Sequence, residues 1–189
     1  MFSVENVIYS DNDFFDIFSI KILQGDKKNL LNDPFSMVIT EELAVKIFKD
    51  ENPIGKSIKF NNNYSFTITG VIENRDDFHV QYSAIADFTS LKDLRGGGEE
   101  SFLTSLGPRN YLVYILSKHN NKQELESKIN AYFMGKGYWN EDNPPDFWLR
   151  DFSNIYLDDN ISYEMGCVHG NRKVVVSFIV IAIFILVIA

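Results

Sequence analysis

The sequence predicts an α+β fold, in which one sheet carries helices on one of its faces. Three observations indicate this class. Short apolar runs typical of strands alternate with segments whose apolar residues recur at helical spacing. The helical segments are few and short. Residues 58–60 and 64–68 alternate apolar with polar side chains on either side of three asparagines, which predicts a β-hairpin and therefore antiparallel pairing.

The first expected elements are two strands around a short helix. Residues 5–9 and 21–24 are predicted as strands, and Gly25 closes the second. The helix covers residues 14–18, whose side chains are apolar on one side. The polar residues 10–11 just before it offer a capping oxygen.

The middle of the chain predicts a buried strand followed by a helix. Residues 36–40 form a short apolar run suited to a buried strand, and Thr40 can cap the helix that follows. The residues that share the expected buried face of that helix are Leu43, Ala44, Ile47 and Phe48. The second hairpin strand extends to Ile72, and residues 84–88 predict a further strand.

The later part predicts one more helix between two strands. Residues 111–116 and 147–152 are the strand candidates. Asn121 and Glu124 have the spacing of a capping box, which begins the helix, and Gly135 ends it. The residues expected on its buried face are Leu125, Ile129, Tyr132 and Phe133. The three glycines at 96–98 predict a mobile loop or an internal boundary.

The end of the chain predicts a membrane helix. Residues 174–189 are apolar except for Ser177 and follow a polar step that carries Arg172 and Lys173. A spanning helix needs about 20 apolar residues, so this run is interpreted as the start of one, cut off at the chain end. A core helix or a core strand is the alternative, but a globular helix would carry a polar stripe. Residues 1–173 are then expected to form a soluble head.

The composition supports a compact head and limits the kinds of binding and cross-linking that are expected. The 189 residues are 45% hydrophobic and include 16 Phe and 9 Tyr, enough for a core of one domain or two small ones. A net charge of −8 without a basic stripe argues against nucleic-acid binding. The single cysteine, Cys167, excludes an internal disulfide and a cysteine-built zinc site. No signal peptide is recognised, so an extracytoplasmic head would have to be exported by something upstream, most simply an earlier transmembrane helix.

Two local patterns resemble binding loops without matching them. The triplet at residues 55–57, Gly-Lys-Ser, resembles the end of a phosphate-binding loop, but Asp50 stands where that loop needs a glycine. We therefore expect a turn before a strand and no nucleotide. Asp11, Asp13 and Asp16 resemble a calcium loop, but Phe15 occupies a ligand position, so a capped helix start is expected.

The remaining polar and aromatic candidates indicate no catalysis. The acidic pairs at 141–142 and 158–159 are interpreted as solvated loop charges. The histidines, which lack metal-ligand spacing and are expected at surface or capping positions, are His79, His119 and His169. Cys167 lies two residues before His169, which does not define a nucleophile and its base. Core positions are favoured over a groove or the membrane surface for Tyr132, Tyr138, Trp139 and Trp148. We predict no enzyme, no catalytic residue, no cofactor and no metal, and the substrate-binding residues are unknown.

An ordered series of motifs resembles a known family, the MacB-like periplasmic core domain of FtsX-type ABC transporter permeases. The motifs are DFFDIF at 13–18, ILQGD at 22–26, SMVITEELAVKIF at 36–48, NPIGKSI at 52–58 and FTITGVI at 66–72. Residues 170–189 resemble the point where such a domain runs into the second transmembrane helix. The series covers most of the chain in the family's order.

The resemblance implies an extracytoplasmic head of two small α/β lobes, porter-like and sabre-like. Residues 36 to about 100 would be the inserted lobe within a head at 1–173, on the periplasmic side of the inner membrane. The implied partners are a cytoplasmic ATPase, a second permease copy or paired permease, and a periplasmic or outer-membrane protein. The implied function is to couple ATP hydrolysis to export, lipoprotein release or mechanotransmission outside the membrane.

Two other function classes stay open. A membrane-anchored binding or sensor module, with a ligand between the lobes, is the second hypothesis, and an enzyme is the third. An adjacent gene for an ATPase would favour the permease, whereas a neighbouring kinase or regulator would favour the sensor.

Overall fold

A computed structural model shows two compact units, and each is described by itself. The described residues are 6–60, 63–94, 111–118, 121–137, 139–157 and 170–188. The first unit draws on residues 1–114 and 164–168, and the second draws on residues 115–163 and 169–189.

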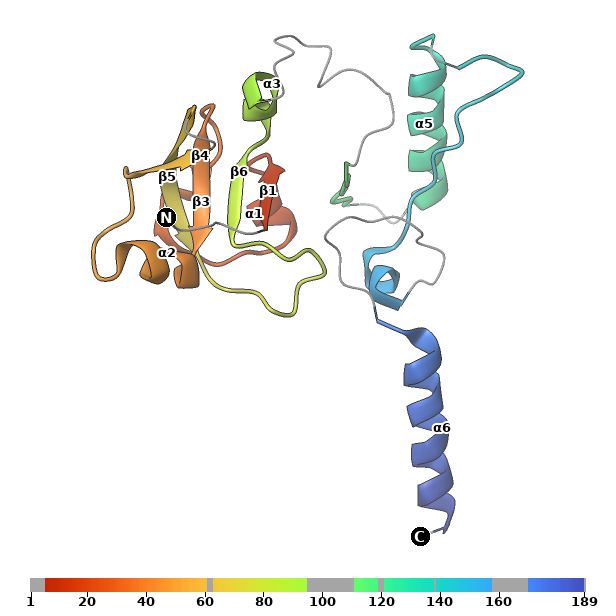
Figure 1. The fold of residues 1–189 in the computed structure, drawn as a ribbon. Coiled ribbons are helices and arrows are strands. Elements are labelled where there is room, and N and C mark those ends of the chain that lie inside the picture. Colours follow the sequence, from red (N-terminus) through yellow and green to blue (C-terminus); the bar gives the residue numbers. More distant parts are fainter. Residues whose placement is uncertain are drawn as a thin grey trace. The chain divides into compact units, whose positions relative to one another are not determined.

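The first unit is built on a six-stranded mixed sheet (Figure 1). Its strands are β1 (Val7–Ser10), β2 (Ile22–Gly25), β3 (Ser36–Thr40), β4 (Ser57–Phe60), β5 (Tyr64–Ile72) and β6 (Ala84–Asp87). The strand order is β1-β6-β3-β5-β2, and β4 also pairs with β5. The pairs β1–β6 and β3–β5 are parallel, and the other pairs are antiparallel. The fold class is therefore α+β with one mixed sheet, as the sequence predicts.

Short helices connect the strands of this unit. They are α1 (Phe14–Ile17), η1 (Lys27–Asn29), α2 (Glu41–Phe48), η2 (Phe88–Ser90) and α3 (Leu91–Leu94). The cap expected for α2 is present, because the Oγ1 atom of Thr40 accepts a hydrogen bond from the amide of Leu43 at 3.3 Å. Glu41 and Glu42 occupy the first turn of α2, where the helix dipole favours negative charge.

Apolar side chains cover both faces of the sheet. One cluster contains Phe14 and Phe15 of α1 together with Val38 and Ile85. Side chains alternate along a strand, so Met37 and Ile39 of β3 point into the other cluster, which also contains Leu43 of α2. Helices thus lie on both faces of the sheet, whereas the sequence predicts helices on one face only. The reason is that all five residues of β3 are buried, as in a strand covered on both sides.

The face of α2 is less buried than predicted. Leu43 and Ala44 are buried, but Ile47 and Phe48 are only partly buried at the margin of the second cluster. The Nζ atom of Lys56 lies 5.1 Å from the centroid of the Phe48 ring. Phe48 therefore lies at the edge of the core and stays partly exposed to water.

The second unit contains the helices α5 (Lys122–Met134), η3 (Phe152–Leu157) and α6 (Arg172–Ile188) (Figure 1). The predicted capping box of α5 is confirmed, because the Oδ1 atom of Asn121 accepts from the amide of Glu124 at 3.3 Å and its Nδ2 donates to the Glu124 carboxylate at 2.6 Å. The predicted face of α5 is less buried than expected, because Leu125, Ile129 and Phe133 are only partly buried and Tyr132 is 60% exposed.

Two strand predictions are also wrong. Residues 111–116 form no strand, and the side chain of Val113 is 80% exposed. Residues 147–151 are likewise irregular, and η3 begins at Phe152. In place of a neighbouring strand, the side-chain amide of Asn130 bonds the backbone of Phe147 twice, at 2.7 and 2.8 Å. The apolar pattern alone cannot supply the pairing partner that makes a strand.

The helix α6 has 17 residues, and its large apolar side chains are exposed, from 41% for Val175 to 80% for Leu186. Within the described part of the chain, no helix reaches both the length and the apolar character needed to span a membrane. The predicted mobile segment at 96–98 lies outside the described residues.

Candidate functional site

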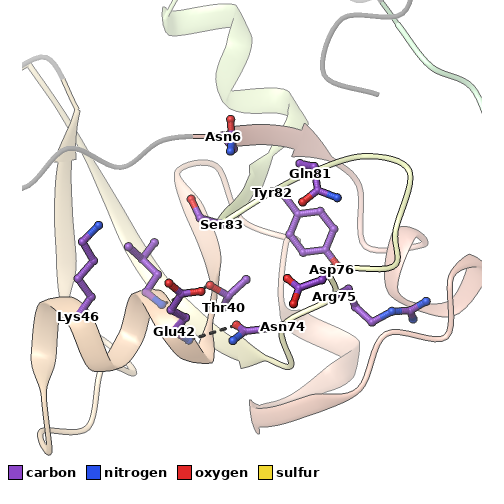
Figure 2. Close-up of a pocket in the computed structure, with 11 residues that line it drawn as sticks. Asn6, Thr40, Glu42, Lys46, Asn74, Arg75, Asp76, Gln81, Tyr82 and Ser83 are labelled. Carbon is purple, nitrogen blue, oxygen red and sulfur yellow. Dashed lines mark hydrogen bonds between the residues drawn. The ribbon is translucent and has the colours of Figure 1, made fainter. Parts of the chain in front are cut away.

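A polar pocket opens at the end of the sheet where the parallel strands β3 and β5 finish (Figure 2). Its volume is about 200 Å³. The lining residues are Asn6, Thr40, Glu42, Leu43, Lys46, Asn74, Arg75, Asp76, Gln81, Tyr82 and Ser83. Clefts at the carboxyl ends of parallel strands are common ligand sites, because the chain diverges there into separate connections.

Backbone bonds hold the strand ends around this pocket. The amide of Thr40 donates to the carbonyl of Ser83 at 3.0 Å, and the amide of Ser83 donates to the carbonyl of Asn6 at 3.0 Å. The side chain of Asn74 accepts from the amide of Glu42 at 3.2 Å, the dashed line in Figure 2. This last bond ties the segment after β5 to the first turn of α2, so the rim is fixed by the fold.

The charges around the pocket are balanced. Figure 2 shows Glu42 and Lys46 on α2, and Arg75 and Asp76 on the segment that follows β5. The guanidinium of Arg75 pairs with the carboxylate of Asp77, at 2.7 Å from Nε and 3.3 Å from Nη2. The hydrogen bond from Arg75 lowers the pKa of the Asp77 carboxyl. Such a rim suits a small ligand with both donors and acceptors.

Tyr82 joins the pocket to the aromatic core. Its ring extends toward the segment of Asp76 and Arg75 (Figure 2) and meets the rings of Phe14 and Phe78 edge-on, each at 5.9 Å. The hydroxyl is buried, and no described residue bonds to it. Burial raises the pKa of Tyr82 to about 12. The phenol is therefore neutral at ordinary pH.

A second feature of functional interest is the junction between η3 and α6. The amide of Gly170 donates to the carbonyl of Tyr156 at 2.7 Å. A Cβ atom at Gly170 would lie 2.4 Å from Cε1 of Tyr156 and 2.9 Å from Cδ2 of Leu157, so a larger residue does not fit without movement. The Oδ1 atom of Asn171 then caps α6 by accepting from the amides of Lys173 and Val174. Gly170, two residues before α6, is therefore tightly packed against η3.

The residues singled out in the two loop-like patterns do not come together as sites. Gly55 has a φ of +79° in the turn before β4, as predicted for a turn. Lys56 pairs with the Glu51 carboxylate. Asp16 pairs with Lys27 at 2.5 Å. Asp13 is the N-cap residue of α1, but its side chain accepts no capping hydrogen bond, and the Oδ1 atom of Asp11 accepts from the amide of Asp13 at 3.2 Å. The described residues contain no cluster of three or more metal-binding side chains.

The histidine and aromatic predictions are corrected in part. His79 is buried, not at the surface, and its Nε2 lies 2.5 Å from the hydroxyl of Tyr114 within an aromatic cluster. Trp148 and Tyr132 are largely exposed, and Trp139 stacks edge-on with Phe147 in the second unit. Glu141 and Asp142 are exposed, as expected of loop charges. Five candidates lie outside the described residues, namely His119, His169, Cys167, Tyr138 and the pair at 158–159.

The sequence reasoning missed the pocket residues. Their only local signal is a polar segment directly after one strand, at 74–76, and another directly before the next strand, at 81–83. Each segment alone is typical of a surface turn. They converge only because β5 and β6 lie on either side of β3, and the sequence patterns did not predict this order.

The fold and its site define an α+β domain with a small polar pocket, and comparisons with known proteins place it further. Residues 2–132 match the family of the MacB-like periplasmic core domain. The match covers more than half of the chain, so the chain belongs to this family, as the motif series predicts. The family is the periplasmic domain of MacB-like and FtsX-like ABC transporter permeases, which work with cytoplasmic ATPases.

Three solved structures are similar to this chain at low sequence identity. A domain of a permease-like protein from Porphyromonas gingivalis matches with a TM-score of 0.51 and 17% identity, over 78% of this chain and 69% of that one. The periplasmic region of MacB from Actinobacillus actinomycetemcomitans gives 0.49 and 18%, over 76% and 60%. The extracellular domain of the Gram-positive transporter YknZ gives 0.35 and 19%, over 45% and 44%. No curated protein matches the sequence significantly.

Proposed function

We propose that this chain is the extracytoplasmic part of an ABC transporter permease and that it transmits movement from a membrane helix into the head. A cytoplasmic ATPase would supply the energy, and the work, such as export or lipoprotein release, would be done outside the membrane. The head itself would carry no catalysis. The division into a head at 1–173 with an inserted lobe at 36 to about 100 is part of this proposal.

The proposal places the beginning of a transmembrane helix at α6. Its 17 residues span about 26 Å at 1.5 Å per residue, close to the roughly 30 Å of a hydrocarbon core. Its apolar side chains are exposed all around the helix, and no polar stripe faces water. Lipid would remove this surface from water. The head would then lie on the periplasmic side of the inner membrane.

The observation that carries the mechanical role is the junction at Gly170. A displacement passes through packed, stiff elements, whereas a flexible linker dissipates it. The hydrogen bond from Gly170 to Tyr156 and the cap at Asn171 support this role, because they hold the residues directly before α6 against η3. Movement of α6 would therefore move η3 with it.

An insertion tests this role in the intact transporter in membranes. A short Gly-Ser segment between Asn171 and Val174 is expected to leave ATP hydrolysis intact and to abolish the extracytoplasmic output. The same segment inserted after Phe60, in the connection between β4 and β5, is the matched control and should preserve both activities. Full output with the insertion at the junction would exclude the proposed transmission of movement from α6 into the head.

A sensor module is the second candidate function, and the pocket at the ends of β3 and β5 favours it. Its fixed rim and balanced charges suit a small polar ligand better than a catalytic step. Asn74→Ala, which removes the bond to α2, should weaken such binding if a ligand uses this rim. Partners such as a second permease copy or an outer-membrane protein belong to the first proposal and can be tested by cross-linking in cells.

A further inference from the structure

We infer that η3 and the first turn of α6 form a surface that lies in the headgroup layer of a phospholipid bilayer. This inference rests on the proposed function, because it takes α6 as a membrane helix. The surface comprises Phe152, Tyr156, Arg172 and Lys173, and we call it the interfacial surface. It would hold η3 on the membrane through contacts beyond α6 itself.

The aromatic part of this surface is presented to solvent. Phe152 and Tyr156 are each 52% exposed, although aromatic side chains of this size are usually buried. Both lie on η3, and η3 is joined to α6 by the bond between Tyr156 and Gly170. Aromatic residues are enriched at membrane interfaces, where an apolar ring and a polar tip such as the Tyr156 hydroxyl are both accommodated.

The basic part of this surface needs an anion. Arg172 and Lys173 occupy the first turn of α6, which contains no acidic residue. The helix dipole is positive at this end, so two cations there are unfavourable unless a negative group offsets them. Within the described residues, neither side chain forms an ion pair. Lipid phosphates lie at this depth of a bilayer and can accept both side chains.

Attraction of the whole chain to an anionic membrane cannot account for binding through the interfacial surface. The chain carries a net charge of −8, and Asp151 is exposed directly before Phe152. Anionic lipids would repel most of the head. Contact is therefore expected only where aromatic rings and the two cations coincide, next to the apolar helix. The bilayer surface is the binding partner that fits the aromatic rings, the two cations and the adjacent apolar helix.

The test uses the full chain reconstituted in phospholipid vesicles. One spectroscopic reporter lies on the interfacial surface and another lies on α6. Trp139 and Trp148, the only two tryptophans, are changed to Phe, and Phe152→Trp gives a single emitter on the interfacial surface. Lipids brominated near the headgroup should quench it more than lipids brominated deep in the chain. Separately, Cys167→Ser with Ser177→Cys allows a polarity-sensitive dye on α6, which should report an apolar environment.

Charge variants complete the test. In vesicles of phosphatidylcholine with phosphatidylglycerol, R172Q/K173Q should reduce the shallow quenching at position 152. The matched control K21Q/K28Q, at two exposed lysines of the first unit, should not. An apolar signal at 177 without shallow quenching at 152 would overturn the inference and leave the proposed function intact. Shallow quenching that survives R172Q/K173Q would overturn the role of the cations. A water-exposed signal at 177 would overturn the proposed membrane helix.

Discussion

At the scale of single residues, Tyr82 links the pocket to stability and to pH. Its buried hydroxyl has no bond to any described residue, so the folded protein bears a desolvation cost without a compensating hydrogen bond. Tyr82→Phe removes that hydroxyl and keeps the ring contacts with Phe14 and Phe78. We expect the free energy of unfolding at neutral pH to stay constant or to rise by up to about 1 kcal/mol.

The same residue predicts a loss of stability in alkaline solution. The pKa of Tyr82 is raised from 10.0 to about 12 in the folded state. Below pH 10 both states hold the proton, whereas between pH 10 and about 12 only the unfolded state releases it. The free energy of unfolding should fall across this window. Denaturant titrations of the protein and of Tyr82→Phe check this, and equal slopes with pH in both would contradict it.

Gly170 is the residue on which the junction depends. Gly170→Ala places a methyl group 2.4 Å from the Tyr156 ring, so the hydrogen bond between the two residues should weaken. Hydrogen exchange of the Gly170 amide is expected to become faster in the variant. Gly135→Ala is the control, because its nearest neighbour would be 3.5 Å away and its φ is −69°. Unchanged exchange at position 170 would show that the junction tolerates a side chain.

At the scale of elements, α2 offers a graded test of core packing. Leu43 is buried, Phe48 is partly buried and Val45 is 59% exposed. Leu43→Ala is expected to lower the free energy of unfolding by about 2–5 kcal/mol. Phe48→Ala should cost less than the roughly 3–5 kcal/mol of a fully buried aromatic, and Val45→Ala less than about 0.5 kcal/mol. Denaturant titration measures all three, and a larger loss at Val45 than at Leu43 would reverse the assigned face.

The element α2 also shows why some local predictions succeed. Its cap at Thr40 and its start at Glu41 depend on atoms within one turn, so the sequence alone predicts them. The same holds for the cap at Asn121. On the predicted face of α5, Leu125, Ile129 and Phe133 are only partly buried and Tyr132 is exposed. Periodicity identifies an apolar face, but only a neighbouring element can cover it.

At the scale of the whole molecule, the tail should be separable from the head. No large apolar side chain of α6 is buried, so removal of residues 174–189 should not change the core clusters of the first unit. The truncated chain is expected to be soluble and to unfold cooperatively with an unchanged midpoint in denaturant. A truncated chain that lacks a cooperative transition would assign α6 to the core.

The sequence by itself determined the family, the α+β class and most elements of the first unit. These follow from local order: the hairpin of β4 and β5, the strand β3 and the helix α2 lie where spacing predicts them. The tertiary structure alone decided the strand order, the cover on both faces and the fate of residues 111–116 and 147–152. It also brought Thr40 beside Ser83 and so built the pocket. The physical reason is that a strand, a buried face or a cavity needs partners distant in the chain, and residue spacing carries only local information.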